Sequence, residues 1–290
     1  MRISKLQTKT AIALFESLGN RSIYGAPIRR SFVLSPGKGK PSQLVALLSS
    51  AKNGGGGRGG RVRIMLEISL ILSAGIKEPY AIRRSPTSWA ELVGLEDAQV
   101  AGARSIRNAL TQLEQHKLVK IGPEKEPTVH LLNETGNGEP YSLPYKDEKG
   151  YFRIPPELWT TGLINRLEAP GLCMYLCALA TVKRKTDGRS TVFWFAPAAT
   201  RKRFGVGNST RLKGIKELIE QGVFIDVTDL DGEGYLVGYK RNTTKYLRVA
   251  ARYMLPESGQ SPEKAETIKM EDFSLWGETS APMWDDEPPF

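Results

Sequence analysis

Cysteine, histidine and long apolar runs are scarce in this chain of 290 residues. Two cysteines and two histidines are too few for a disulfide framework or for a four-ligand zinc site. No run approaches the roughly 18 apolar residues of a membrane span, and the run AIALF near the start is shorter than the apolar part of a secretory signal, about 7–15 residues. The cysteine usage fits a reducing compartment. The sequence therefore predicts a cytoplasmic protein with no metal, no other cofactor and no membrane contact.

Acidic residues are also scarce, except at the end of the chain. The net charge is +10, from 41 Lys and Arg against 31 Asp and Glu. Residues 1–63 hold twelve basic side chains and one acidic side chain, whereas residues 254–290 hold nine acids and two lysines. A basic body of this kind favours polyanions, because binding releases the counterions condensed on phosphates. The clustering of the charge favours nucleic-acid binding over a role in solubility alone.

Composition divides the chain into five parts. Residues 1–61 are basic and rich in Gly, Pro and Ser, and they end in NGGGGRGGR, which predicts a flexible arm with a Gly-rich linker. Residues 134–150 form a second predicted linker, and the acidic, Pro-rich residues 254–290 form a predicted disordered tail. Two periodic regions remain, 62–133 and 151–253, and each is long enough for a core of its own.

The first periodic region has the element order of a winged helix-turn-helix domain. A helix is predicted at 62–75, a short strand at 80–84, and a second helix after the capping-box pair Ser88 and Glu91. In the third helix, within 99–118, Ile106, Leu110 and Leu113 share one face. Two β-type runs around a polar turn close the region.

The second periodic region repeats this order. Helices are predicted at 169–185, 197–204 and 208–222, with a strand at 190–196 and a hairpin over 223–250. Residues 105–121 align without gaps on residues 211–227, so that Ile106 meets Leu212. The predicted fold is α+β and mainly helical, with two tandem winged helix-turn-helix domains, a flexible basic N-terminal arm and an acidic disordered C-terminal tail.

The third helix of each domain is the predicted DNA-contacting element, because in helix-turn-helix proteins it lies in the major groove. Asn suits adenine, Arg and Lys suit guanine, and hydroxyls suit bases or phosphates. The predicted core side in domain two is Leu212, Ile215, Leu218 and Ile219. The predicted DNA contacts of domain two are Arg201, Lys202, Arg203, Asn208, Ser209, Thr210, Arg211, Lys213, Lys216, Lys240, Arg241 and Lys245. Domain one adds Arg104, Arg107 and Asn108, but its acidic turn leaves two alternatives open, a second half-site or a dimer or partner platform.

Catalytic patterns are missing from the sequence. The glycine run at 54–60 lacks the Gly-Lys-Ser/Thr ending of a phosphate-binding loop. His116, His130 and the pair Cys173 and Cys177 are expected to be structural, as are Phe193 and Phe195, whereas Trp194 is a candidate for stacking on bases. The sequence predicts that the protein is not an enzyme.

The last seven residues, Trp284-Asp285-Asp286-Glu287-Pro288-Pro289-Phe290, resemble the C-terminal tip of bacterial single-stranded DNA-binding protein. In that family the tip docks on replication and repair enzymes. The resemblance implies that Phe290 is the anchor, that Pro289 shapes the tip, and that Asp285, Asp286 and Glu287 supply charge to a basic partner. Pro288 departs from the family's usual isoleucine. The alternative is a tail that serves solubility or weakens non-specific DNA binding.

Two basic winged helices in one chain also resemble the replication initiators of bacterial plasmids and phages. That resemblance is architectural and transfers no residue. It implies a protein of the bacterial cytoplasm, associated with the nucleoid or a plasmid, which binds double-stranded origin DNA and recruits host replication proteins. A homodimer is a separate expectation, with domain one as its platform. The alternatives are a winged-helix transcriptional regulator and a protein-interaction adaptor with non-specific nucleic-acid binding.

Overall fold

The computed structural model of the chain describes residues 25–37, 40–49, 58–74, 78–124, 127–146, 150–182, 193–226 and 252–254. This part of the chain is α+β and mainly helical, and its strands form small antiparallel sheets. It divides into two compact units, residues 1–181 with 197–218 and residues 182–196 with 219–290. This division does not follow the predicted boundary at 134–150. Among the described residues, no helix is long and apolar enough to cross a membrane.

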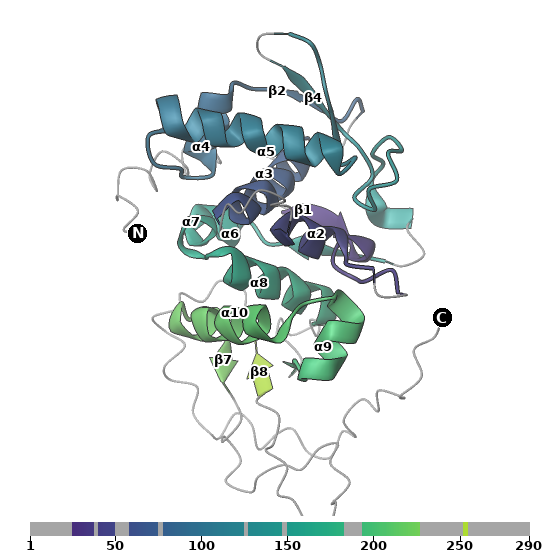
Figure 1. The fold of residues 1–290 in the computed structure, drawn as a ribbon, viewed down its shortest axis with the longest axis vertical. Helices are drawn as coiled ribbons and strands as arrows, with labels where there is room; N and C mark the ends of the chain where they lie inside the picture. Colours follow the sequence, from purple (N-terminus) through teal and green to yellow (C-terminus); the bar gives the residue numbers. More distant parts are fainter. Residues whose placement is uncertain are drawn as a thin grey trace, which may run out of the picture. The chain divides into compact units, whose positions relative to one another are not determined.

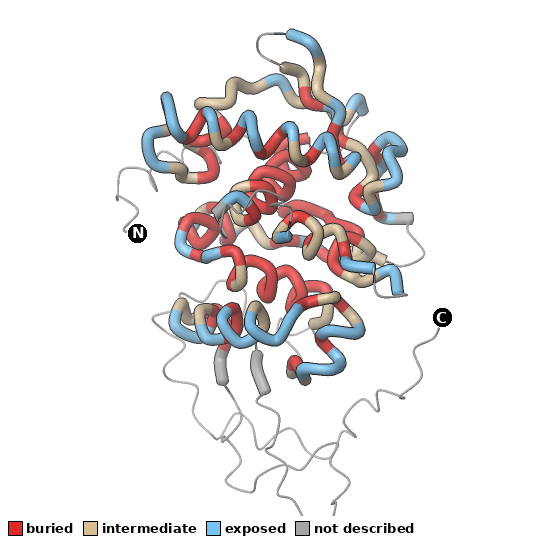
Figure 2. The backbone as a smooth tube through the Cα atoms, viewed as in Figure 1, coloured by how far each residue is buried: buried red, intermediate tan, exposed pale blue. Residues whose placement is uncertain are grey.

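Two helices of the first unit are buried around most of their circumference. They are α3 (Arg58–Ala74) and α8 (Ala169–Thr181), which contact each other and appear red along most of their length in Figure 2. A helix that is apolar on all sides belongs in a core. Residues 171–180 of α8 have no charged side chain, and residues 64–74 of α3 are apolar except for Glu67, Ser69 and Ser73. The predicted helices at these places are confirmed, although α3 begins four residues earlier, inside the Gly-rich run.

Two helices, the turn between them and a three-stranded sheet lie next to α3. The helices are α4 (Pro86–Leu92), one π-helical turn (η3, Ala98–Gly102) and α5 (Ala103–Gln115). The strands are β2 (Ala81–Arg83), β3 (Val119–Ile121) and β4 (Thr128–Leu131), in the order β2-β4-β3. The predicted strand and hairpin are confirmed here. The capping prediction was displaced by one turn, because Ser85 caps α4 by accepting a hydrogen bond from the Ser88 N–H.

Part of the predicted flexible arm is folded, which corrects the prediction for residues 25–37 and 40–49. Strand β1 (Ala26–Arg29) pairs antiparallel with β5 (Tyr151–Ile154), a 3-10 turn follows at Arg30–Phe32 (η2), and α2 (Gln43–Ser49) contacts α3. Six apolar side chains are fully buried: Ala26, Ile28, Phe32, Val33, Leu44 and Leu47. They are few enough for the Gly, Pro and Ser around them to dominate the average composition, which is why composition predicted an arm.

The predicted linker at 134–150 also contributes to the core. Glu134 is fully buried and forms an ion pair with Arg29 of β1, and Arg29 also donates to the Ser142 carbonyl and hydroxyl at 2.8 and 2.9 Å. Tyr141 is buried beneath the same guanidinium. A 3-10 turn, Pro144–Lys146 (η4), leads toward β5. The prediction failed because the partners, 105 residues apart, leave no local signal.

Four further helices lie wholly or mostly in the first unit. After β5 come α6 (Glu157–Thr160) and α7 (Leu163–Arg166), and later α9 (Pro197–Phe204) and α10 (Asn208–Glu220). The predicted bounds of α9 are confirmed. Helix α10 lies close against α8 at two glycines, Gly171 of α8 and Gly214 of α10. A Cβ atom on Gly214 would lie 2.3 Å from the Pro170 carbonyl oxygen. Helices α5, α3, α8 and α10 therefore follow one another in a stack within this unit (Figure 1).

The second unit contains a small sheet in the order β6-β8-β7, made of β6 (Phe193–Trp194), β7 (Ile225–Asp226) and β8 (Arg252–Met254). Phe193 makes edge contacts with Phe195 and Phe224, and all three are buried. The predicted core role of Phe193 and Phe195 is confirmed. The predicted hairpin tip at 231–234 and residues 254–290, apart from Met254, lie outside the described residues.

Candidate nucleic-acid interface

Helix α5 is held by its apolar face and by the turn before it. Ile106, Leu110 and Leu113 are buried as predicted, and the helix contacts α3 and α4. Asp97 has a left-handed backbone (φ 46°), and its carboxylate accepts a hydrogen bond from the Ala101 N–H at 3.1 Å. These contacts fix the direction in which the opposite face of α5 points.

The opposite face of α5 is polar and exposed. Arg104, Arg107, Asn108 and Thr111 all lie there. The Thr111 hydroxyl donates to the Arg107 carbonyl at 3.1 Å, within the helix. The structure thus brings the three predicted residues of domain one onto one solvent-facing surface, with side chains suited to guanine, to adenine and to phosphate.

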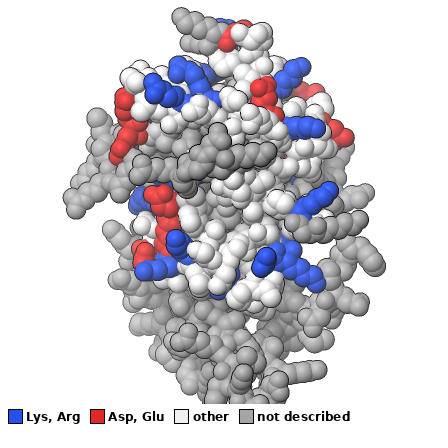
Figure 3. Space-filling model, in the orientation of Figure 1, with Lys and Arg blue, Asp and Glu red and all other residues white. Residues whose placement is uncertain are grey.

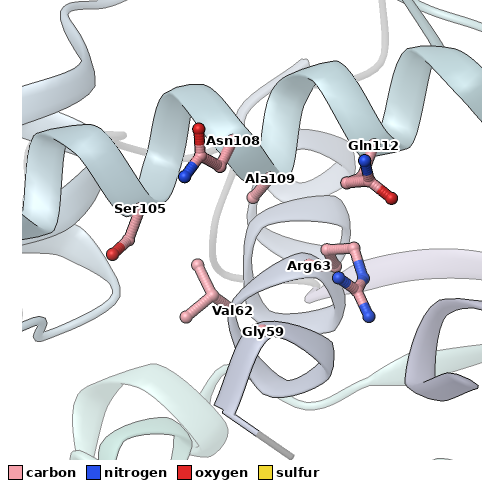
Figure 4. A pocket seen from close by; sticks show the side chains of 7 residues that line it. All are labelled: Gly59, Val62, Arg63, Ser105, Asn108, Ala109 and Gln112. Atoms are coloured by element: carbon pink, nitrogen blue, oxygen red, sulfur yellow. The ribbon is translucent and has the colours of Figure 1, made fainter. Parts of the chain in front are cut away.

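A hollow borders this face on one side. Figure 4 shows Ser105, Asn108 and Gln112 of α5 beside Val62 and Arg63 of α3. Arg63 is fixed by two hydrogen bonds to the Leu47 carbonyl, at 2.8 and 2.6 Å, and burial lowers its pKa. No carboxylate, cysteine or histidine lines the hollow, so it offers no acid–base or nucleophile–base pair.

The sheet beside α5 adds basic residues that sequence reasoning missed. Lys120 of β3 and His130 of β4 are register partners, both are exposed, and Arg83 at the exposed end of β2 lies on the same side of the sheet. The signal was available, because alternation in VKI and AIR places these residues on the face opposite the buried ones. His130, predicted to be structural, is an exposed member of this surface. The Glu114 carboxylate accepts from the Ile121 N–H at 2.9 Å and ties the end of α5 to the hairpin.

Helix α10 has a buried side made of Gly214, Ile215 and Leu218. The predicted core residues Leu212 and Ile219 are instead 53 % and 37 % exposed, so this part of the core prediction was wrong. The exposed side carries Asn208, Ser209, Lys213 and Lys216, whereas Thr210 and Arg211 are half-buried. The Arg211 guanidinium donates to the Asn208 side-chain oxygen at 2.9 and 3.1 Å.

The cations before α10 fall into two groups. Arg201 and Lys202 are exposed. Arg203 is half-buried over the Phe204 ring, and burial together with the neighbouring Arg30 lowers its pKa. Its backbone carbonyl accepts from the Ser35 N–H at 2.8 Å. Of the three predicted contacts, Arg201 and Lys202 are therefore better placed to meet a nucleic acid than Arg203.

The register of the internal repeat is corrected by one residue. In the predicted alignment Ile106 meets Leu212, but Ile106 is fully buried and Leu212 is exposed. A shift of 105 residues instead places the buried positions Ala109, Leu110, Leu113, Leu118 and Val119 on Gly214, Ile215, Leu218, Val223 and Phe224. It also places Lys117 (φ 57°) on Gly222 (φ 67°), the left-handed residues after the two helices. With this register, the exposed residues Arg104, Arg107, Asn108 and Thr111 correspond to Ser209, Leu212, Lys213 and Lys216.

Basic side chains are mixed with acidic ones on the visible surface. Figure 3 shows blue patches over the region of α5 and again over that of α9 and α10, with red patches among them. On α10, Glu217 turns inward: its carboxylate accepts from the Glu168 N–H at 2.5 Å, and burial raises its pKa. The exposed residues of α10 before Glu217 include two lysines, Lys213 and Lys216, and no acidic residue.

Other predicted residues fall elsewhere. Cys173 and Cys177 are buried free thiols in α8, and burial raises the pKa of Cys177. His116 is half-buried at the end of α5, where burial and Arg63 lower its pKa. No group of three or more metal-ligating side chains occurs among the described residues. The predicted contacts Lys240, Arg241 and Lys245 and the predicted docking residues Asp285, Asp286, Glu287, Pro289 and Phe290 lie outside them.

Neither a protein-family model, nor a curated protein, nor a solved structure matches the chain.

Proposed function

We propose that the chain is a non-enzymatic protein that binds double-stranded DNA through two winged helix-turn-helix modules. One observation carries the proposal: the exposed faces of α5 and α10, which lie opposite buried apolar faces, each carry two basic side chains, Arg104 and Arg107 on α5 and Lys213 and Lys216 on α10. In such modules the third helix lies in the major groove, where it contacts base edges.

The order of elements supports the assignment of two modules. Along the chain the first runs α3, β2, α4, α5, β3, β4. The second runs α8, β6, α9, α10, β7, β8, and its three strands belong to the other compact unit. In both sheets the strand nearest the C-terminus lies between the other two, β2-β4-β3 and β6-β8-β7. The same connection used twice, together with the matched buried positions, favours duplication of one module.

The hairpin of the first module supplies phosphate contacts in this proposal. Lys120, His130 and Arg83 lie on one side of the sheet next to the end of α5. Contacts of this kind position a protein on the duplex, whereas the third helix provides the sequence preference.

The two DNA-contacting helices belong to the same compact unit. Helix α5 packs on α3, α3 packs on α8, and α10 lies against α8 at Gly214. Because this stack fixes the distance between α5 and α10, the proposed DNA site has two parts at one spacing.

The biological role that we infer is replication initiation or an accessory role in replication. It depends on the paired modules and on the C-terminal residues Trp284–Phe290, whose resemblance to the tip of single-stranded DNA-binding protein suggests recruitment of host replication enzymes. A transcriptional regulator with the same modules is the alternative, and the location of the bound sites separates the two roles. An adaptor would bind DNA without sequence preference.

Selection of duplexes from a random pool by the full-length chain tests the proposal. We expect a two-part consensus whose affinity exceeds that for random DNA by about 10³-fold or more at the same salt concentration. The consensus should occur as spaced repeats at an origin for an initiator and at promoters for a regulator. Enrichment of no consensus, with equal affinity for every duplex, would contradict sequence-specific binding.

Removal of residues 285–290 tests recruitment separately. We expect the truncated chain to keep its DNA affinity and to lose binding to a helicase, primase or polymerase-associated partner in a pull-down with purified proteins. A rise in DNA affinity without any change in partner binding would instead show that the tail opposes DNA binding.

A further inference from the structure

One apolar side chain lies among the polar residues on the exposed side of α10. Leu212 is 53 % exposed, while its neighbours Ser209, Lys213 and Lys216 are polar and exposed. Apolar side chains contribute to stability when they are removed from water. More than half of Leu212 is left in water, so the fold gains little from it.

The position of Leu212 in the motif is that of a base contact. It lies in the second turn of α10, the N-terminal part of the helix that contacts base edges in helix-turn-helix proteins. In the corrected register it corresponds to Arg107, which is exposed on α5. The two helices therefore present different chemistry, an aliphatic group and a guanidinium, at the same place in the motif.

Each chemistry has a partner in the major groove. Arg forms bidentate hydrogen bonds with guanine, whereas the C5-methyl group of thymine is the apolar group that a base pair displays there. We propose that Leu212 is a specificity-determining residue that contacts a thymine methyl group, and that Arg107 contacts a guanine at the equivalent position of the other half-site. The inference rests on the proposed DNA binding and adds the base that each residue selects.

Replacement of single thymines by deoxyuridine tests Leu212, because deoxyuridine lacks only the C5-methyl group. The duplex is the consensus selected by the wild-type chain. At one thymine we expect wild-type affinity to fall by about fourfold, the effect of one buried methyl group. Leu212→Ala should bind the thymine and deoxyuridine duplexes equally at that position.

Two further variants sharpen the test. Leu212→Arg installs the side chain of the equivalent position and should change the selected base there from thymine to guanine. Ile219→Ala removes the other exposed aliphatic side chain of α10, seven residues further along. Because Ile219 lies in the last turns, this control should respond to deoxyuridine as the wild type does.

The outcomes separate the two claims. If a consensus is selected but Leu212→Ala and the wild type respond alike to every deoxyuridine substitution, or Leu212→Arg selects the wild-type base, the assignment of Leu212 is wrong while DNA binding stands. If no consensus is selected, the proposed function itself fails, and the inference with it.

Discussion

At the scale of single residues, Glu67 is the least expected feature of the structure. It lies in α3 and is fully buried, and neither of its carboxyl oxygens has a hydrogen-bond partner among the residues that the structure describes. Burial raises its pKa well above the ordinary value, and the neighbouring Glu134 adds to this effect. Burial therefore favours the neutral form of this carboxyl group.

This burial predicts how stability depends on pH. The pKa of Glu67 is higher in the folded than in the unfolded state, so the folded state binds the proton more tightly. The contribution is present in full below the unfolded pKa and is lost as pH rises from there toward the folded pKa. We expect Glu67→Met to raise the free energy of unfolding at pH 8 by about 1–4 kcal/mol, the range found when buried ionic groups are replaced by apolar ones.

Urea unfolding at pH 5 and pH 8 measures the effect. The gain from Glu67→Met should be smaller at pH 5, where more of the wild-type carboxyl is protonated in both states. If Glu67→Met raised the free energy of unfolding equally at both pH values, its effect would come from packing and not from loss of an ionisable group.

Arg107 carries the residue-scale prediction for DNA binding. It is exposed at the centre of the polar face of α5. Arg107→Ala should cost about 1–3 kcal/mol on the selected duplex and relax the preference at one base pair. Gln115→Ala, exposed at the end of the same helix, is the control and should change affinity little. Equal losses for Arg107→Ala on selected and random duplexes would indicate a phosphate contact instead.

At the scale of elements, the packing of α10 on α8 depends on a glycine. A Cβ atom at position 214 would lie 2.3 Å from the Pro170 carbonyl oxygen and 2.6 Å from Met174 Cγ. We expect Gly214→Ala to lower the free energy of unfolding by about 1–3 kcal/mol, because the two helices have to move apart. Gly207→Ala is the matched control, since a Cβ atom there meets nothing within 4 Å. Similar unfolding midpoints for both variants would show that the contact is not close in solution.

Elements with a strong local signal were predicted well. The bounds of α9 and the hairpin of the first module follow from turn residues and alternation, and the exposed face of α5 follows from helical periodicity. The register of the repeat could not be predicted, because the sequence of α10 places Leu212 and Ile219 at core spacing. In the structure the side of α10 that packs on α8 contains Gly214 and Leu218 instead of Leu212 and Ile219. A search for the spacing of apolar residues does not detect a glycine that packs closely against another helix.

Most of the other differences between the predicted and the observed fold involve contacts between residues far apart in the sequence. The strand pair β1 and β5 joins residues 26–29 to residues 151–154. The Arg29–Glu134 ion pair joins the predicted arm to the predicted linker. Neither leaves a periodic pattern, because each depends on a partner more than a hundred residues away. The candidate DNA surface was easier to predict, since exposure and charge repeat locally along a helix.

At the scale of the whole molecule, one stack of helices contains both α5 and α10, the two helices that we propose to contact DNA. This arrangement predicts a fixed spacing between the two halves of the DNA site. Inserting five base pairs between the halves turns one half to the other side of the duplex, since a helical turn is about 10 base pairs. We expect such an insertion to reduce affinity by at least tenfold, and an insertion of ten base pairs not to restore it. Unchanged affinity for either insertion would mean that one helix alone binds the site.

The most direct measurement of the central claim is methylation interference at guanine N7, which lies in the major groove. The chain is bound to its selected duplex, and the interfering guanines are mapped for the wild type and for Arg107→Ala and Lys213→Ala. The account predicts interference in two clusters, with Arg107→Ala removing signal from one cluster and Lys213→Ala from the other. Binding that no major-groove methylation weakens, in the wild type or in either variant, would contradict it.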